Sequence, residues 1–269
     1  MRERICLKLY CAMLNGHAIW FLTFADSRFD SWKRLGKQAK ELGWFDKIIA
    51  GDERMFDDWY REKYASRFSD RGFGYWQWKS YLIRRELDKM NEDDVLVYCD
   101  GGCALNVSGY ERFLEYVRMV SQSDSGVILF DQGMNPREWT KGDIFNYFSL
   151  NPDLLGNSQV AGGIIILKKC ANSSSLINEW YYICHNHYEL INDIPSKLPN
   201  YPEFVENRHD QCILNILAHK YRVLKLSFEE LYRVDEDWSK MSKYPIWAIR
   251  QRDRKLSIKQ KIKKILKWS

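Results

Sequence analysis

Two apolar runs of the sequence each end on an aspartate, and a carboxylate in this position could bind a cation or act as a general base. Residues 94–106 read DVLVYCDGGCALN, so the apolar run ends at Asp100 with two glycines after it. Residues 18–25, AIWFLTFA, lead in the same way to Asp26. A plain strand followed by a turn accounts for this pattern, since Asp and Gly are common turn residues. A site accounts for it equally well, because glycines let a bulky ligand approach the main chain.

Charged side chains also occur beside glycines or aromatic rings in three further stretches: RGFGYWQWKSYLI (71–83), AGGIIILKK (161–169) and NRHDQCILNIL (207–217). In the first stretch, Arg71 and Lys79 bracket a glycine-containing turn. A turn followed by an aromatic helix explains the rings of this stretch but not the two cations. In the third stretch, Asp210 begins a predicted helix, where simple N-capping is the alternative to a catalytic role.

Several common catalytic motifs are absent from the sequence. No glycine-rich dinucleotide fingerprint follows the first apolar run, and no GxxxxGK[ST] phosphate loop or GxSxG elbow occurs. Redox chemistry with NAD, P-loop phosphoryl transfer and Ser-His-Asp hydrolysis are therefore disfavoured. The seven cysteines are scattered, which is typical of reduced thiols in a cytoplasmic protein. For CHNH (184–187) we expect a polar helix face and not a zinc site.

Strand-like runs alternate with helical patterns along most of the chain. Apolar runs predict strands at 18–25, 45–51, 94–100, 126–130, 161–169 and 222–227, and helical spacing predicts helices at 30–43, 54–68, 75–90, 108–121, 173–192 and 210–219. This alternation predicts an α/β fold with a mostly parallel sheet and helices on both faces. Ligands of such sheets bind beyond the carboxyl ends of the strands, where Asp26 and Asp100 are expected.

The last residues of the chain differ from the rest in charge. The 269 residues carry a formal net charge of +5, and lysines and arginines crowd the end of the chain. We predict one domain over residues 1–250 and a basic amphipathic helical tail over 251–269 that binds an anionic membrane surface. A terminal helix packed on its own domain is the alternative. No export signal and no membrane-spanning run is recognisable, so we predict a cytoplasmic protein that is peripheral on the plasma membrane.

The order and spacing of GFGYWQWK, YCDGGC and RHDQ resemble GT-A fold glycosyltransferases, in particular bacterial enzymes of polysaccharide and lipopolysaccharide assembly. The resemblance covers residues 18–250. It implies a GT-A type sheet, a nucleotide-sugar donor, a glycan or lipid-linked acceptor, and Mn²⁺ or Mg²⁺ as the cofactor. No nucleic acid is expected as a partner.

The resemblance also implies roles for individual residues. The family's DxD motif corresponds to Asp100, Gly101 and Gly102, so the second acidic residue is missing here. Asp100 would bind the metal, with His209 as a second ligand, or Lys79 and Arg250 would neutralise the diphosphate instead. The other implied donor-site residues are Asp26, Arg71, Gly101, Gly162 and Gly163, of which the last two would line the sugar.

The resemblance further implies that Asp210 is the catalytic residue. In an inverting enzyme it would deprotonate the acceptor hydroxyl, and in a retaining enzyme it would lie near the anomeric carbon.

Two other functions are compatible with parts of this pattern. A sugar-phosphate nucleotidylyltransferase shares the sheet type, but it would need a glycine-rich basic loop after the first strand, which residues 26–34 do not provide. A non-catalytic carbohydrate or nucleic-acid binder could use the many aromatic residues and the basic tail. Such a binder would not require Asp100 and Asp210 to converge on one pocket.

Overall fold

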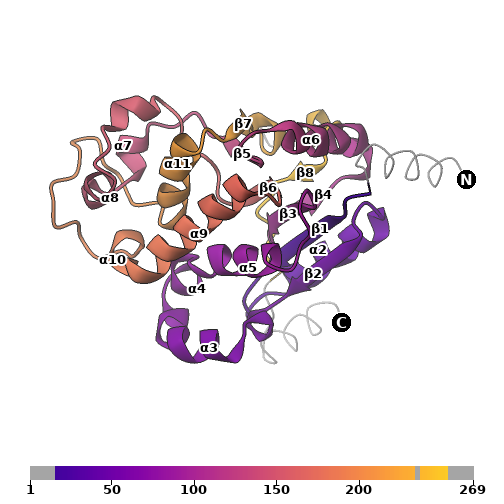
Figure 1. Ribbon diagram of the computed structural model, residues 1–269, viewed down its shortest axis with the longest axis horizontal. Coiled ribbons are helices and arrows are strands. Elements are labelled where there is room, and N and C mark those ends of the chain that lie inside the picture. Colours follow the sequence, from indigo (N-terminus) through magenta and orange to yellow (C-terminus); the bar gives the residue numbers. More distant parts are fainter. Residues whose placement is uncertain (1–15, 234–236, 254–269) are drawn as a thin grey trace, which may run out of the picture.

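A six-stranded mixed sheet forms the centre of the protein (Figure 1). The computed structural model describes residues 16–233 and 237–253. The strand order is β2-β1-β3-β6-β5-β7, and β6 alone runs antiparallel to its neighbours. The strands are β1 (Ile19–Phe24), β2 (Lys47–Gly51), β3 (Val95–Asp100), β5 (Val127–Asp131), β6 (Ile164–Lys168) and β7 (Leu224–Ser227). A second, two-stranded sheet pairs β4 (Ala104–Leu105) with β8 (Ile246–Trp247).

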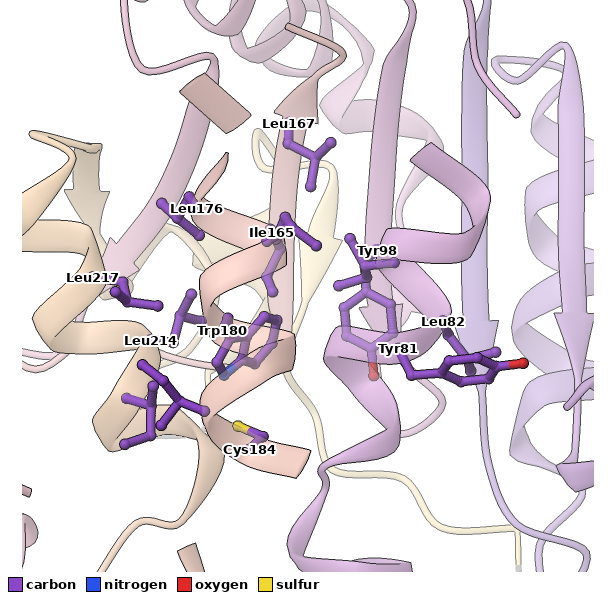
Figure 2. Close-up of a cluster of buried hydrophobic side chains, with 14 of the residues drawn as sticks. Tyr81, Leu82, Tyr98, Ile165, Leu167, Leu176, Trp180, Cys184, Leu214 and Leu217 are labelled. Carbon is purple, nitrogen blue, oxygen red and sulfur yellow. The ribbon is translucent and has the colours of Figure 1, made fainter. Parts of the chain in front are cut away.

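Helices cover both faces of the sheet. Side chains alternate between the two faces along each strand, so both faces present apolar side chains on which helices pack. Tyr98 and Ile165 lie in one hydrophobic cluster with α5, α9 and α11, as Figure 2 shows. Val97 and Ile166 lie in a second cluster with α2 and α6. The helices are α2 (Ser31–Leu42), α3 (Asp58–Tyr64), α4 (Gly72–Tyr75), α5 (Trp78–Leu87), α6 (Tyr110–Gln122), α7 (Pro136–Trp139), α8 (Gly142–Tyr147), α9 (Ala171–Asn186), α10 (Tyr188–Ile191) and α11 (Asp210–Lys220). The predicted α/β fold class, a mostly parallel sheet with helices on both faces, is confirmed, whereas its GT-A type stays a prediction.

The direction of β6 is the feature that matters most for a site. The sequence predicted a strand at 161–169 in a mostly parallel sheet without indicating which strand is reversed; β6 starts at Ile164 and is antiparallel to β3. Gly162 and Gly163 therefore precede the strand. Because β6 is reversed, they lie at the carboxyl end of β3, where the Asp100 N–H donates a hydrogen bond to the Gly163 carbonyl at 2.7 Å.

Three predicted helices have different bounds in the structure. The helix predicted at 54–68 is divided into short pieces, and the one predicted at 75–90 begins only at Trp78. Before it lies an irregular turn that includes α4. The long helix predicted at 173–192 ends at Asn186, and α10 follows after His187. Hydrophobic spacing alone did not reveal these breaks, because packing continues across them.

The predicted basic helix at the end of the chain lies outside the described residues. Residues 251–253, which the sequence analysis placed in the tail, pack against the main domain: Arg34 of α2 binds Asp253 at 2.7 Å. The Gln251 N–H donates to the Gly102 carbonyl at 2.9 Å. The boundary between residues 250 and 251 stays a prediction. Within 16–233 and 237–253, no helix combines the length and apolar character needed to cross a bilayer.

Candidate active site

A cavity of about 750 Å³ opens at the carboxyl end of β1 and β3. All the candidate site residues of the sequence analysis line it: Asp26, Arg71, Lys79, Asp100, Gly101, Gly162, Gly163, His209, Asp210 and Arg250. These residues come from stretches far apart in the chain, and the strand ends and the start of α11 bring them together. Their common location is established, whereas their individual roles stay predictions.

Lys79 is the central cation of this cavity. Its side chain is 4% exposed, although lysine is rarely buried without partners. The ammonium group donates to the Gly162 carbonyl at 2.8 Å and lies 3.3 Å from Asp100 Oδ1 and 3.7 Å from Asp210 Oδ2. Burial lowers the pKa of Lys79, but the charges of Asp100 and Asp210 more than offset this, so the net shift is upward. Lys79 therefore stays protonated and holds two carboxylates near each other.

Asp210 is the most strongly perturbed carboxylate of the cavity. It is the first residue of α11, and its Oδ2 atom is buried without a hydrogen-bond partner among the described residues. Burial raises its pKa to about 7; the charge of Lys79 opposes this shift, and that of Asp100 adds to it. A carboxylate that titrates near neutral pH can both accept and release a proton under physiological conditions, as a general base must.

Asp100 is anchored on one side and closely packed on the other. Its Oδ1 atom accepts a hydrogen bond from the Tyr98 hydroxyl and faces Lys79. Its Oδ2 atom lies against Gly163, where an added Cβ would come within 3.0 Å of it. A side chain at position 163 would therefore push the carboxylate away, so glycine is required for this close approach.

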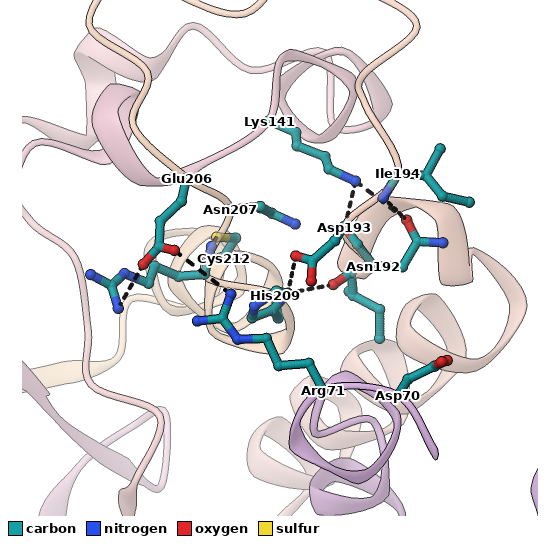
Figure 3. A network of polar contacts seen from close by, with 12 residues as sticks. Asp70, Arg71, Lys141, Asn192, Asp193, Ile194, Glu206, Asn207, His209 and Cys212 are labelled. Atoms are coloured by element: carbon teal, nitrogen blue, oxygen red, sulfur yellow. Dashed lines mark hydrogen bonds and ion pairs between the residues drawn. The ribbon is translucent and has the colours of Figure 1, made fainter. Parts of the chain in front are cut away.

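His209 occupies an unusual backbone conformation directly before Asp210. Its φ of 57° and ψ of −128° are rare for a residue other than glycine. The ring is buried, and Nδ1 lies 2.8 Å from the Ile191 carbonyl. Figure 3 shows the ring close to Asp193. Since a carbonyl only accepts, Nδ1 carries the proton and Nε2 has a free lone pair. Nε2 has no hydrogen-bond partner among the described residues, and burial lowers the pKa of His209.

The predicted metal ligands do not form a prepared metal site. Mn²⁺ and Mg²⁺ prefer several oxygen ligands, carboxylates above all. The described part of the chain contains no group of three or more His, Cys, Asp or Glu side chains arranged around a common point. One oxygen of Asp100 is already occupied by Tyr98 and Lys79. The binding of a metal by Asp100 and His209 therefore stays a prediction.

Cations outnumber acids in the lining of the cavity. Three aspartates, Asp26, Asp100 and Asp210, face six cations: Arg28, Arg71, Lys79, Arg208, Arg250 and Arg252. Arg28 is bound to Asp26 at 2.6 Å. Arg71 approaches the carboxylate of Glu206 at 3.7 Å (Figure 3), and Arg208 approaches the same carboxylate at 3.2 Å. The lining therefore favours an anionic ligand.

Sequence reasoning missed several residues of the cavity wall. Arg208 and Gln211 flank the His209-Asp210 pair, and Gln211 Nε2 donates to Gln132 Oε1 at 2.9 Å. Their place in RHDQ was a usable signal. Arg252 lies within the predicted tail, where no signal pointed to the cavity.

CHNH (184–187) is not a polar helix face throughout. Cys184 and His185 are buried, and the His185 ring contacts the Tyr60 hydroxyl at 2.9 Å and the Tyr181 carbonyl at 2.7 Å. The interpretation as a solvated face is therefore wrong for these two residues, because helix α9 turns them toward the core.

Comparisons with known proteins give similarity in structure but not in sequence. No family model matches the chain, and no curated protein sequence matches it. A glycosyltransferase involved in glycosylation of the major capsid of PBCV-1 is 8% identical, with 86% of this chain and 91% of that chain covered and a TM-score of 0.47. Mouse xyloside xylosyltransferase 1 is 13% identical, with 86% and 84% covered and a TM-score of 0.44.

The galactosyltransferase LgtC, solved with donor and acceptor sugar analogues, is 10% identical, with 85% and 86% covered and a TM-score of 0.42. Similarity at this level concerns the path of the chain alone. Function is therefore inferred from the cavity and its side chains.

Proposed function

We propose that this protein is a glycosyltransferase that moves a sugar from a nucleotide-sugar to a glycan or lipid-linked acceptor. The observation that carries the proposal is the buried Lys79 ammonium held between Asp100 and Asp210, beside the glycine wall formed by Gly162 and Gly163. This cluster faces a cavity with a surplus of cations. A binding module would not need a buried carboxylate whose pKa is shifted to about 7.

The charges suit the departure of a sugar from a diphosphate. As that bond breaks, negative charge grows on the phosphate oxygens, and cations that are already in place stabilise it. Lys79 neutralises much of the charge of Asp100 and Asp210, so that an anionic ligand can approach them. Arg250 and Arg252 line the same cavity and form no ion pair with any described residue, so both remain available for phosphate oxygens.

Asp210 is proposed as the catalytic residue. In a transfer with inversion, its Oδ2 atom would take the proton of the attacking acceptor hydroxyl. That atom has no competing hydrogen-bond donor nearer than Lys79 at 3.7 Å. The proposal leaves the stereochemistry open, because a carboxylate in this place also suits a site near the anomeric carbon.

Three finer features belong to the same proposal. The acceptor is a bacterial surface glycan or its lipid-linked precursor, as the sequence resemblance implies. The basic residues after position 253 would hold the enzyme at an anionic membrane surface, where such an acceptor occurs. If Mn²⁺ or Mg²⁺ accompanies the diphosphate, the carboxylate of Asp100 would hold it.

A panel of UDP-, GDP- and dTDP-hexoses tests the proposal directly. We expect the wild-type protein to hydrolyse or transfer at least one of them, assayed with and without Mn²⁺, and Asp100→Ala to lose this activity while remaining folded. Calorimetry with the matching nucleoside diphosphate should show weaker binding by Arg250→Met. Lys37→Met, on an exposed position of α2 outside the cavity, is the matched control. A protein that binds and cleaves none of these donors is not the proposed enzyme.

A further inference from the structure

The turn before α5 has a left-handed backbone at five consecutive residues. The φ angles are 63° at Gly72, 60° at Phe73, 91° at Gly74, 49° at Tyr75 and 59° at Trp76. Left-handed conformations cost free energy at every residue except glycine, and usually occur singly. A run of five, three of them aromatic, persists only where the surroundings impose it. Such strain concentrates at ligand sites, so it calls for a functional explanation.

The turn places the Trp76 ring at the cavity wall. Its backbone N–H donates to the Gly72 carbonyl at 3.3 Å, and the same carbonyl accepts from Trp78 Nε1 at 3.0 Å. The indole covers Gly72 so closely that an added Cβ there would lie 2.5 Å from the ring. Trp76 is half-buried, and both Gly72 and Trp76 line the cavity.

Trp76 lies next to the catalytic residues proposed above. Its ring centre is 5.3 Å from that of His209, which precedes Asp210. This part of the wall thus combines an aromatic surface with two polar atoms that have no hydrogen-bond partner among the described residues, Nε2 of His209 and Oδ2 of Asp210. Both are acceptors when unprotonated, and both suit a ligand that carries hydroxyl groups.

We propose that Trp76 is a stacking surface for a pyranose ring of the acceptor and that the left-handed turn exists to hold it there; this inference rests on the proposed glycosyltransferase function. The C–H face of a pyranose packs well on an indole, while its hydroxyls project from the ring edge. A sugar on Trp76 directs one hydroxyl to the free lone pair of His209 Nε2 and the attacking hydroxyl to Asp210 Oδ2. Trp76 therefore determines which acceptors are used.

Plain core packing explains the ring less well. An aromatic residue that only fills the core can do so from an ordinary helical turn, as Tyr81 does in α5. Trp76 also packs against this core, but it occupies a strained backbone position and lines the cavity.

Two glycine substitutions distinguish the effect of moving the Trp76 ring from the effect of straining the turn. Gly72→Ala and Gly74→Ala both place a side chain at a positive φ, but only the Cβ at position 72 collides with the Trp76 ring. At position 74, the nearest atom is the Arg67 carbonyl oxygen at 3.2 Å. Comparing the two variants at equal folded fraction thus isolates the effect of moving Trp76.

The readout is the ratio of sugar transfer to donor hydrolysis, with methyl α- and β-hexopyranosides as acceptors and the best donor of the panel. We expect Gly72→Ala and Trp76→Ala to lower this ratio about two- to tenfold, the scale of one lost aromatic contact. Gly74→Ala and Trp76→Phe should change it little. Binding of the nucleoside diphosphate should stay the same in all four variants, because this inference assigns Trp76 to the acceptor and not to the nucleotide.

Other results would overturn the inference. Equal ratios in Gly72→Ala and Gly74→Ala mean that the position of the ring does not matter. A parallel fall of hydrolysis and transfer assigns Trp76 to the donor side. A wild-type enzyme that hydrolyses a donor but transfers to no pyranoside contradicts the acceptor site alone, whereas the absence of both reactions contradicts the proposed function itself.

Discussion

The protein buries polar groups in two ways, and they differ in how completely each group is paired. In the cavity, Asp210 Oδ2 and His209 Nε2 have no hydrogen-bond partner among the described residues. Between α6 and the short helix after β7, by contrast, the guanidinium of Arg112 binds both oxygens of Glu230 at 2.8 and 2.6 Å, and the Tyr116 hydroxyl adds a third bond at 2.6 Å. Neither Arg112 nor Glu230 lines the cavity.

The same contrast separates two buried histidines. Both ring nitrogens of His185 have partners, the Tyr60 hydroxyl and the Tyr181 carbonyl, and the residue lies within regular helix α9. His209 has one partnered nitrogen and a strained backbone. Leaving a buried polar atom unpaired costs free energy, and folding alone gives no reason for it. Unpaired buried atoms also occur elsewhere in the described part of the chain, for example in Arg84 and Gln159, but those of His209 and Asp210 belong to residues that line the cavity, where a bound ligand would complete their hydrogen bonds.

The largest effect is expected from Asp210→Asn. This variant keeps the size and the capping ability of the side chain but removes the proton acceptor, so kcat should fall about 10²–10⁴-fold. The melting temperature should not fall, because a neutral amide is easier to bury than the carboxylate. Steady-state kinetics and thermal unfolding measure the two quantities. A lower melting temperature with unchanged kcat would show that Asp210 is only a helix cap.

The next effect concerns the cation at the centre of the cavity. Lys79→Met leaves two carboxylates without their common partner, which should lower the free energy of unfolding by roughly 3–5 kcal/mol. In the double variant with Asp210→Asn, most of this loss should be recovered, because the fully buried carboxylate is gone. Urea unfolding of the two single variants and the double variant tests this coupling. Additive losses would mean that Lys79 stabilises the fold independently of Asp210.

The sequence predicted the location of the site better than its geometry. Asp100 and Asp210 were found because a carboxylate after an apolar run, or at a helix start, is visible in the residue order. The approach of Gly163 to Asp100 depends on the antiparallel direction of β6, which alternation of strands and helices does not reveal. The burial of Lys79 was also hidden, since a lysine in a helical pattern is usually exposed.

The left-handed turn at 72–76 shows a second limit of sequence reasoning. Two glycines indicated a turn, but three of its five residues are aromatic and do not favour a positive φ. In this conformation Tyr75 and Trp76 contact the ring of His209, and such contacts join segments far apart in the chain. Local preferences therefore located the turn and missed its handedness.

A substitution in the hydrogen-bonded cluster of Arg112, Tyr116 and Glu230 should lower stability and leave activity unchanged, the opposite of what is expected for Asp210→Asn. Glu230→Gln replaces a carboxylate that accepts three hydrogen bonds, and we expect the free energy of unfolding to fall by about 1–3 kcal/mol. Donor cleavage at a temperature where the variant is folded should equal that of the wild type. Chemical denaturation and the donor assay together check this. Loss of activity in the folded variant would show that the two regions are coupled and would contradict a purely stabilising role of this cluster.

The last effect, which is absent at neutral pH, is the pH dependence that His185 gives to stability. Burial lowers its pKa from 6.5 to about 3, so between these values the unfolded chain binds a proton that the folded protein does not. Acidification therefore favours unfolding: the contribution of His185 is fully present above pH 6.5 and is lost at about 1.4 kcal/mol per pH unit below it. In His185→Gln, this part of the slope should disappear between pH 6 and pH 4, a range taken from those two pKa values.

Urea unfolding at several pH values compares this variant with the wild type and with His187→Gln, whose histidine is not fully buried. Only His185→Gln should flatten the curve, because burial of the His185 ring disfavours its protonated form in the folded protein. Identical slopes for all three proteins would mean that the ring titrates freely in the folded state. Complete hydrogen bonding would then not distinguish the buried polar groups outside the cavity from those that line it.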